Sequence, residues 1–253
     1  RSTGELVAIK VLRNPPQETV WQRYLQEASI MNTLSHPGIV SIYDFIVDNQ
    51  RNACLVMELI DGPSLATVLD CGGAVIEEQA VPIFLKCCEA LSYLHEHGII
   101  HRDIKPSNIM LYSQNLDSMV VKLADFGISK QIDSSNQIEL TKQGEIFGSP
   151  LYMSPEQCSS DEVDERSDIY SLGCVMYEVL TGMPPFRGDN CLETMNMHMN
   201  SPVPEFISRG KSITSGMKAL IIKAMEKKKE VRFQSAKELA DTIRSACSAQ
   251  LAS

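Results

Sequence analysis

Two short clusters of polar residues lie close together in the middle of this 253-residue chain. The first is His101-Arg102-Asp103-Ile104-Lys105-Pro106-Ser107-Asn108, and the second is Asp125-Phe126-Gly127. Phosphoryl transfer needs such residue types, because the phosphate charges must be neutralised while a hydroxyl is held in line with the leaving oxygen. Asp103 can accept the hydroxyl proton, and Lys105 can neutralise the moving phosphate. Asn108 and Asp125 supply hard oxygen ligands that suit Mg²⁺.

Hydrophobic patterns predict the elements that hold these clusters. Apolar, β-branched runs predict strands near 5–13, 39–47 and 52–58, and a buried strand over 120–124 directly before Asp125. From Ala80 onward helical spacing dominates. One apolar helix face consists of Val81, Phe84, Leu85, Cys88, Leu91 and Leu94, and another of Ile169, Leu172, Met176, Val179 and Leu180. We therefore expect an α+β chain, with a small sheet first and a larger, mainly helical part after it.

Two helix ends can also be predicted. Gly182, followed by Met183-Pro184-Pro185, is expected to end the helix that begins near Ile169. Ser235 is expected to cap the start of a later helix, with Glu238 as the reciprocal partner of a capping box.

Further motifs follow in an order that is typical of one family. Val7-Ala8-Ile9-Lys10 lies on the first predicted strand, Glu27 lies in a helical pattern beside it, and the segment 148–156 lies downstream of both clusters. Together these residues resemble the protein kinase family, from about Gly4 to about Ala246. Lys105 two residues after Asp103, together with Ser149 and the run 164–173, resembles the serine/threonine type and most of all the bacterial, eukaryotic-like serine/threonine kinases.

The resemblance implies a two-lobed, protein kinase-like α+β fold that forms a single catalytic domain over residues 1–253. Its small antiparallel-sheet N-lobe would cover 1–57, a hinge 58–62, and a larger helical C-lobe 63–253. The family carries a glycine-rich loop before the lysine strand, whereas this chain begins at Arg1. We therefore expect an N-lobe that is truncated at its start or completed from outside these residues, and weaker ATP binding for lack of that loop.

The function that the resemblance implies is an ATP-dependent protein serine/threonine kinase, which transfers the γ-phosphoryl of Mg-ATP to Ser or Thr hydroxyls, including its own activation segment. Asp103, Lys105 and Asn108 would be catalytic, and Asn108 and Asp125 would bind Mg²⁺ or Mn²⁺. The residues expected to bind ATP are Lys10, Glu27, Ala8, Met57, Glu58, Ile60 and Met110. Lys10 and Glu27 would form an ion pair.

Regulation would depend on the segment between Asp125 and Glu156. In relatives, the arginine at the position of Arg102 docks a phosphorylated residue of this segment. Thr141 is the best candidate for that phosphorylation, and Glu145 could be a weaker, permanent anion for Arg102 or a solvated loop charge. Ser149 supplies a hydroxyl that the resemblance places next to the catalytic Asp and Lys.

Several residues near the clusters are expected to be structural. The resemblance implies that His101 packs beneath the metal site rather than acting as a base, and that Asp168 accepts N–H bonds from the backbone of the catalytic loop. Glu156 and Arg232 would form a buried ion pair. A lone Asp in a loop is usually a turn residue, but the neighbouring Lys105 and Asn108 favour catalysis for Asp103.

Composition narrows the partners. A net charge of −9 and a pI near 5.1 argue against nucleic acid as a partner, because binding to its backbone is driven by clustered Lys and Arg.

The eight cysteines form no C-x-x-C pair and are expected to be reduced. No apolar run approaches membrane-spanning length, so we expect no membrane partner within this chain and a cytoplasmic location, with a tether outside these residues left open. Protein substrates carrying Ser or Thr are expected, with self-association for trans-autophosphorylation as an option.

Two alternatives stay open at this stage. A pseudokinase or nucleotide-binding regulatory module is favoured only by the absent glycine-rich loop. A small-molecule kinase of related fold is disfavoured by the segment 149–156, which positions a peptide in relatives.

Overall fold

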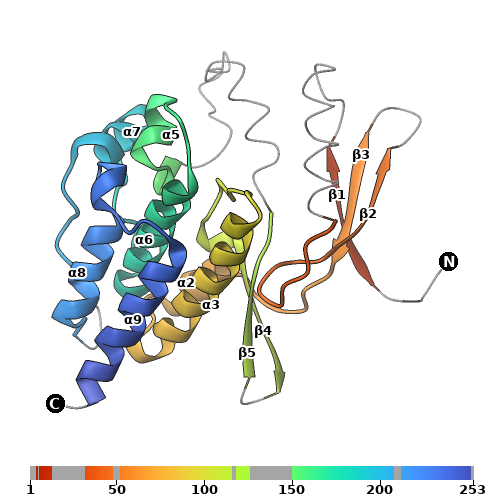
Figure 1. Cartoon of the computed structure of the whole chain (residues 1–253), viewed down its shortest axis with the longest axis horizontal. Coiled ribbons are helices and arrows are strands. Elements are labelled where there is room, and N and C mark those ends of the chain that lie inside the picture. Colours follow the sequence, from red (N-terminus) through yellow and green to blue (C-terminus); the bar gives the residue numbers. More distant parts are fainter. Residues whose placement is uncertain are drawn as a thin grey trace.

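The computed structural model describes residues 4, 6–12, 32–47, 52–115, 118–125, 150–207 and 212–251. A small antiparallel sheet lies on one side of the molecule and a group of helices on the other, with a two-stranded hairpin between them (Figure 1). None of the described helices is long and apolar enough to cross a bilayer. The α+β architecture predicted from the hydrophobic patterns is confirmed.

The small sheet contains three strands, β1 (Val7–Leu12), β2 (Ile42–Val47) and β3 (Ala53–Glu58), in the order β1-β3-β2. All neighbours are antiparallel, and β1 pairs with β3 so that Ala8 lies opposite Met57 and Lys10 opposite Leu55. The three predicted strands are confirmed, although each begins one to three residues later than expected. In this register Val7 lies opposite Glu58, the last residue of β3, and Lys10 lies three residues further along β1.

The hairpin consists of β4 (Ile109–Asn115) and β5 (Ser118–Leu123). The β5 strand was predicted, but β4 was not, because a short apolar run such as Ile109-Met110-Leu111 does not distinguish strand from helix. Leu123 also bridges to Ile39 in parallel, and its backbone N–H donates to Gly38 O at 2.8 Å. The hairpin is therefore bonded to the chain that leads into the small sheet.

The helical part is built around α6 (Glu165–Thr181), which is buried along almost its whole length. Helices α3 (Glu77–Glu96) and α8 (Ser215–Ala224) pack on α6, and α9 (Ala236–Leu251) packs on both α3 and α8. The other described helices are α2 (Leu65–Gly72), α5 (Pro155–Ser159) and α7 (Cys191–Asn200), with 3₁₀ turns η1 (Pro106–Asn108), η2 (Pro150–Tyr152) and η3 (Lys229–Val231). The two predicted apolar faces lie on α3 and α6 and form the core of this part.

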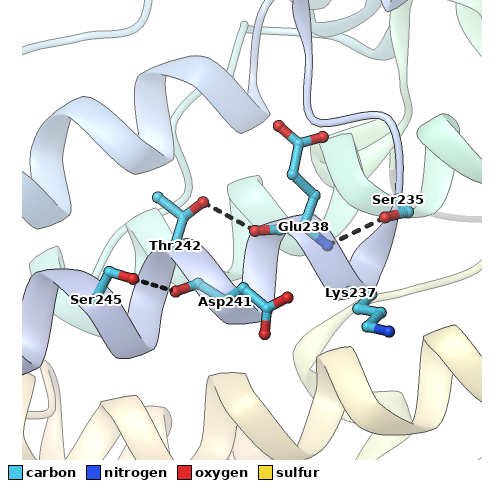
Figure 2. A pocket seen from close by; sticks show the side chains of 6 residues that line it. All are labelled: Ser235, Lys237, Glu238, Asp241, Thr242 and Ser245. Carbon is cyan, nitrogen blue, oxygen red and sulfur yellow. Dashed lines mark hydrogen bonds between the residues drawn. The ribbon is translucent and has the colours of Figure 1, made fainter.

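The ends of α6 and α9 test the capping predictions. Gly182 follows α6 with φ 80° and donates its N–H to Glu178 O, as predicted for a helix stop. Ser235 Oγ accepts the N–H of Glu238 at 3.0 Å, which Figure 2 shows at the start of α9. In a capping box the carboxylate of Glu238 would accept the N–H of Ser235. Here it accepts the N–H of Gln234, one residue before the cap. The box therefore closes on the residue outside the helix.

Gly62 is needed where the segment after β3 passes over β4. A Cβ built on this residue would lie 2.1 Å from Leu111 O and 2.7 Å from the Cβ of Tyr112. Leu111 also donates its N–H to Pro63 O at 2.9 Å, so the two backbones cannot separate without breaking that bond. We expect Gly62→Ala to lower the free energy of unfolding by about 1–3 kcal/mol, because overpacking here displaces backbone. Urea unfolding measures this difference.

Gly72 provides the matched control for that substitution. It lies in the last turn of α2, and a Cβ built there meets nothing within 4 Å. Gly72→Ala should leave stability unchanged or raise it by up to about 1 kcal/mol, since alanine is the better helix former. Equal effects of the two substitutions would show that the close approach at Gly62 is unimportant.

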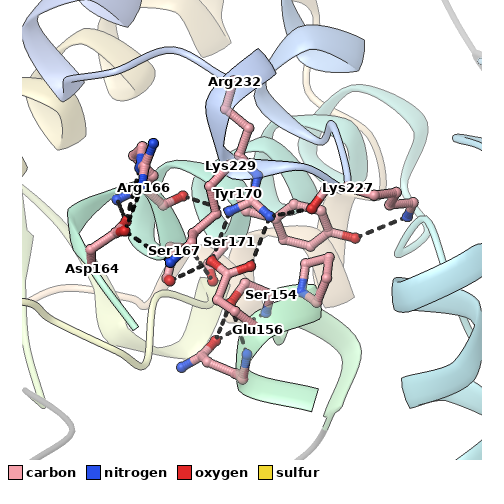
Figure 3. A network of polar contacts seen from close by, with 12 residues as sticks. Ser154, Glu156, Asp164, Arg166, Ser167, Tyr170, Ser171, Lys227, Lys229 and Arg232 are labelled. Atoms are coloured by element: carbon pink, nitrogen blue, oxygen red, sulfur yellow. Dashed lines mark hydrogen bonds and ion pairs between the residues drawn. The ribbon is translucent and has the colours of Figure 1, made fainter. Parts of the chain in front are cut away.

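A buried polar cluster joins α6 to α7. The hydroxyl of Tyr170 is 3.0 Å from His198 Nδ1, and Lys227 Nζ donates to the same hydroxyl at 3.2 Å, as Figure 3 shows for Lys227. The ammonium of Lys227 also lies 4.3 Å from the centre of the Phe186 ring. Burial, with a smaller effect of the Lys227 charge, lowers the pKa of His198 to about 3. The folded chain therefore holds this ring neutral at physiological pH.

This neutral histidine makes stability depend on pH. Between its ordinary pKa of 6.5 and about 3, the unfolded chain binds a proton at His198 and the folded chain does not, so stability falls as pH falls through this window. The contribution approaches about 1.4 kcal/mol per pH unit. Urea unfolding at about pH 7 and about pH 5 should show a smaller pH dependence for His198→Gln than for the unaltered chain. The exposed His97→Gln should retain the full dependence, and equal slopes for all three proteins would contradict the assignment.

Candidate active site

The first cluster forms a hydrogen-bonded unit around the carboxylate of Asp103. Lys105 Nζ lies 2.8 Å from Asp103 Oδ2, and the amide of Asn108 donates to the same oxygen at 3.0 Å. Asn108 also donates to the backbone O of Asp103 at 2.8 Å. The turn η1, which begins with Pro106, brings Asn108 back under Asp103. A carboxylate held by a cation and an amide at such distances is oriented before any substrate arrives.

The second cluster meets the first through the same asparagine. Asn108 Nδ2 is 3.4 Å from the backbone O of Asp125, and Ala124 N donates to Asn108 O at 2.8 Å. Lys10 Nζ, from β1, forms an ion pair with Asp125 Oδ1 at 2.9 Å. Four predicted site residues from three separate segments therefore converge: Lys10 from the sheet, Asp103 and Asn108 from the loop before β4, and Asp125 from the end of β5.

The donor set fits a magnesium ion bound together with phosphates. The amide nitrogen of Asn108 is used in hydrogen bonds, which leaves its oxygen as a ligand, and Asp125 adds a carboxylate. Two protein oxygens with the remaining positions filled by phosphates and water are typical of Mg²⁺ in nucleotide sites. No group of three or more His, Cys, Asp or Glu side chains suited to a metal occurs in the described ranges. The residues therefore fit a metal that arrives with its nucleotide rather than one held by protein alone.

The backbone beneath the site is held by Asp168 of α6. Its carboxylate accepts the N–H groups of His101 and Arg102, both at 2.8 Å, and contacts His95 Nε2 at 2.8 Å. Arg102 has φ 63° and Asp125 has φ 53°, a region that non-glycine residues seldom adopt. Such strain persists only where the surroundings enforce it, and it clusters at functional sites. The predicted role of Asp168 as acceptor for this loop is confirmed.

His101 is buried and links the two clusters. Its Nδ1 accepts the N–H of Asp103 at 3.3 Å, and its Nε2 lies 3.2 Å from Ala124 O. A neutral ring with its proton on Nε2 satisfies both contacts. Burial lowers the pKa of His101 in spite of the nearby carboxylates of Asp168 and Asp103, which supports the neutral form. These contacts show His101 positioning the loop, in agreement with the structural role expected for it.

The residues expected around the adenine lie on both sides of the segment after β3. Ala8 and Met57 are paired neighbours in the sheet, and Met110 lies on β4, where it bridges to Ser64. The N–H of Glu58 donates to Ser41 O and its carboxylate pairs with Lys122, so its role toward ATP stays a prediction. Ile60 and its neighbours 59 and 61 make no backbone hydrogen bond to another described residue.

Four predicted site residues lie outside the described residues: Glu27, Thr141, Glu145 and Ser149. The pairing of Lys10 with Glu27 and the regulatory segment therefore stay predictions. Arg102 itself is described, and its backbone O accepts the side-chain amide of Gln157 at 3.0 Å. This bond joins the loop of Asp103 to α5, directly after the segment expected to position a peptide.

The predicted ion pair between Glu156 and Arg232 is confirmed and lies at the centre of a larger network (Figure 3). Arg232 donates to both carboxylate oxygens, at 2.7 and 2.8 Å, and Ser167 Oγ donates to the same carboxylate. The remaining N–H groups of Arg232 donate to backbone oxygens of Arg166, Glu226 and Lys227. Burial alone would raise the pKa of Glu156, but the hydrogen bonds and charge of Arg232 outweigh it and hold the pKa below its ordinary value.

Sequence reasoning missed several residues that support the site. At the segment after β3, Lys122 pairs with Glu58, and Gly62 allows a close approach to β4. At the loop of Asp103, Gln157 donates to Arg102 O, and His95 contacts Asp168, the acceptor for that loop. A charged residue inside the otherwise apolar run 119–124 was a usable signal for Lys122, because a lysine on a buried strand requires a partner.

A shallow surface pocket along α9 is a separate feature. It is lined by Ser235, Lys237, Glu238, Asp241, Thr242 and Ser245 (Figure 2). Thr242 Oγ1 and Ser245 Oγ donate to backbone oxygens of their own helix. These groups serve the helix and are not part of the site around Asp103.

The sequence of this chain is similar to that of known protein kinases, in agreement with the residues found at the site. A family model described as protein kinase domain matches residues 1–242. The serine/threonine-protein kinases PknB of Mycobacterium leprae and of Mycolicibacterium smegmatis are each 40% identical over 246 residues, which is 94% of this chain and 38% of the relative. The chain therefore spans 38% of the length of these relatives.

A solved structure extends the likeness to the fold. Rad53 (residues 1–466) in complex with AMP-PNP superimposes with a TM-score of 0.77 at 26% identity, over 96% of this chain and 58% of that one. The small sheet, the helical part and the converging polar residues thus occur together in a chain whose sequence and fold both match one family. The chain belongs to the protein kinase family and resembles its bacterial serine/threonine members.

Proposed function

We propose that this chain transfers the γ-phosphoryl of Mg-ATP to Ser or Thr hydroxyls of proteins. The observation that carries the proposal is the convergence of Lys10, Asp103, Asn108 and Asp125 through hydrogen bonds and ion pairs of 2.8 to 3.4 Å. These are the residue types that phosphoryl transfer requires, and they come from segments far apart in the sequence. Similarity to the PknB kinases supports the serine/threonine type.

In this proposal Asp103 orients the attacking hydroxyl and accepts its proton. Lys105, 2.8 Å from the same carboxylate, neutralises charge on the phosphoryl group as it moves. Asn108 fixes the Asp103 carboxylate through its amide nitrogen. Because these three side chains are already bonded to one another, little reorganisation is needed when a substrate binds.

The nucleotide and its metal would use the rest of the site. Lys10 would contact the α- and β-phosphates, and the segment 58–62 would be the hinge between an N-lobe at 1–57 and a C-lobe at 63–253. Ala8, Met57 and Met110 would enclose the adenine, while backbone groups near Glu58 and Ile60 would bond its edge. Mg²⁺ or Mn²⁺, held by Asn108 and Asp125, would neutralise charge on the phosphates when bound.

Regulation and partners follow from the same proposal. Arg102 would bind an anion of the segment before Glu156, either phosphorylated Thr141 or Glu145, and the Ser149 hydroxyl would lie near Asp103 and Lys105. The chain would act on proteins in the cytoplasm, without nucleic acid as a partner, and would phosphorylate itself between molecules. If so, the rate of phosphate incorporation per chain should rise with chain concentration.

Intact-mass measurement tests the proposal. The purified chain is incubated with Mg²⁺ and ATP beside Asp125→Asn, and each phosphorylated site is mapped. We expect phosphate on serine or threonine of the unaltered chain and none on the variant, because the variant removes a metal-binding charge. Nucleotide binding without any phosphate transfer, to the chain itself or to added protein, would contradict the proposal and indicate a nucleotide-binding module.

A further inference from the structure

A buried charge pair joins the end of β3 to β5. Lys122 Nζ donates to both oxygens of the Glu58 carboxylate, at 2.8 and 2.6 Å. The lysine side chain is only 8% exposed and the glutamate side chain 20%. A lysine enclosed in this way is costly without a partner, and its attraction to one is less screened than at a surface.

The surroundings hold this pair in place. Glu58 Oε2 also accepts the N–H of Ser41 at 3.2 Å, and Glu58 N donates back to Ser41 O at 2.9 Å. One residue earlier, Val40 N donates to Leu123 O at 3.0 Å. The short segment before β2 is therefore bonded to Glu58 on one side and to the strand of Lys122 on the other.

The two members of the pair lie next to different halves of the site. Glu58 is the first residue of the proposed hinge, 58–62, whose backbone groups would bond the adenine edge. Lys122 lies three residues before Asp125 on the same strand end, and Ala124 between them is bonded to Asn108. Figure 1 shows the hairpin of β4 and β5 between the small sheet and the helical part, and Leu123 of β5 bridges to Ile39 in the segment before β2. The pair is thus a direct polar connection between the start of the proposed hinge and the strand that leads to Asp125.

We propose that Glu58 and Lys122 are a positioning pair, which sets the distance between the hinge and Asp125 and so couples adenine binding to metal binding. This inference rests on the proposed function. Neither side chain contacts the reacting groups, and the pair acts through the backbone of β5 and of the hinge. Coupling between two sites is a free energy, so it appears as the factor by which Mg²⁺ raises affinity for the nucleotide.

Calorimetric titration with ADP tests this coupling, because ADP occupies the site without transfer. The dissociation constant is measured with Mg²⁺ and with EDTA, and the ratio of the two gives the coupling factor. For Lys122→Met and for Glu58→Gln we expect this factor to fall about five- to tenfold, within the range typical of coupled sites. Lys122→Arg keeps the positive charge and should therefore retain most of the coupling factor.

An exposed pair supplies the control. Lys223 and Glu238 lie 3.0 Å apart on α8 and α9, far from the hinge, and Lys223→Met should leave the coupling factor unchanged. If Lys122→Met and Glu58→Gln weaken binding equally with and without Mg²⁺, the pair is only structural and the inference is overturned. Should Lys122→Met fail to fold, Glu58→Gln and Lys122→Arg give the same comparison. Absence of ADP binding by the unaltered chain would overturn the proposed function together with this inference, whereas unchanged coupling in the variants would overturn the inference alone.

Discussion

Asp103→Asn should lower the rate of phosphoryl transfer by about 10²- to 10⁴-fold, the range for loss of a general base. An amide oxygen can still accept the hydrogen bonds of Lys105 and Asn108, so the loop should keep its shape, but it cannot take a proton. Steady-state kinetics with a serine peptide should show a lower kcat and an almost unchanged KM for ATP. This split follows from a residue that contacts the hydroxyl rather than the nucleotide.

Asp241→Asn is the matched control for this change. Asp241 is an exposed carboxylate on α9 that pairs with Arg244, so its replacement should leave transfer unaffected. Stability measured by urea unfolding should agree among the three proteins within about 0.5 kcal/mol. An active Asp103→Asn enzyme, or one whose loss of activity merely follows loss of folding, would contradict the role given to Asp103.

Arg232→Met should lower the free energy of unfolding by roughly 3–5 kcal/mol, because it leaves the Glu156 carboxylate buried and unpaired. All five N–H groups of Arg232 have acceptors, which include the backbone oxygens of Arg166 at the start of α6 and of Glu226 and Lys227 in the loop after α8. Their loss adds to the cost. The same change should loosen α5, since Glu156 lies in that helix, and so disturb the segment that would position a peptide.

Two further variants separate charge burial from general damage. Arg232→Met combined with Glu156→Gln should be less destabilised than Arg232→Met alone, because no uncompensated charge remains. Arg244→Met removes an exposed arginine that also forms ion pairs, and should lower the free energy of unfolding by less than about 1 kcal/mol. Equal losses for Arg232→Met and Arg244→Met in urea unfolding would show that the buried network contributes little.

Much of the fold could be predicted because the spacing of apolar residues in this chain follows the period of the strand or helix that they form. The strands around Lys10 and Glu58, and the apolar faces of α3 and α6, follow from spacing alone. The β4 strand could not be predicted, because three apolar residues after a turn are ambiguous. The capping box at Ser235 was predicted from the side-chain types, but the partner of Glu238 depends on the local path of the backbone, which places Gln234 N 2.7 Å from its carboxylate.

The site shows the same division. Asp103, Lys105, Asn108 and Asp125 could be named from residue type and order, since their chemistry leaves few alternatives. Their supporting contacts could not, because Lys122, His95 and Gln157 act through tertiary contacts between segments far apart in the sequence. Glu58 illustrates the difference, since its place at the start of the hinge was predicted, whereas the partner of its side chain lies 64 residues away.

Transfer of phosphate from γ-labelled ATP to three peptides that differ only in the acceptor residue tests whether this chain is a serine/threonine kinase. The acceptor is serine, tyrosine or alanine, and ADP binding is measured on the same sample. We expect label on the serine peptide, little on the tyrosine peptide and none on the alanine peptide, with labelling by Asp103→Asn slower by about 10²- to 10⁴-fold. Tight nucleotide binding with no label on the serine peptide or on the chain itself would contradict the proposed kinase activity.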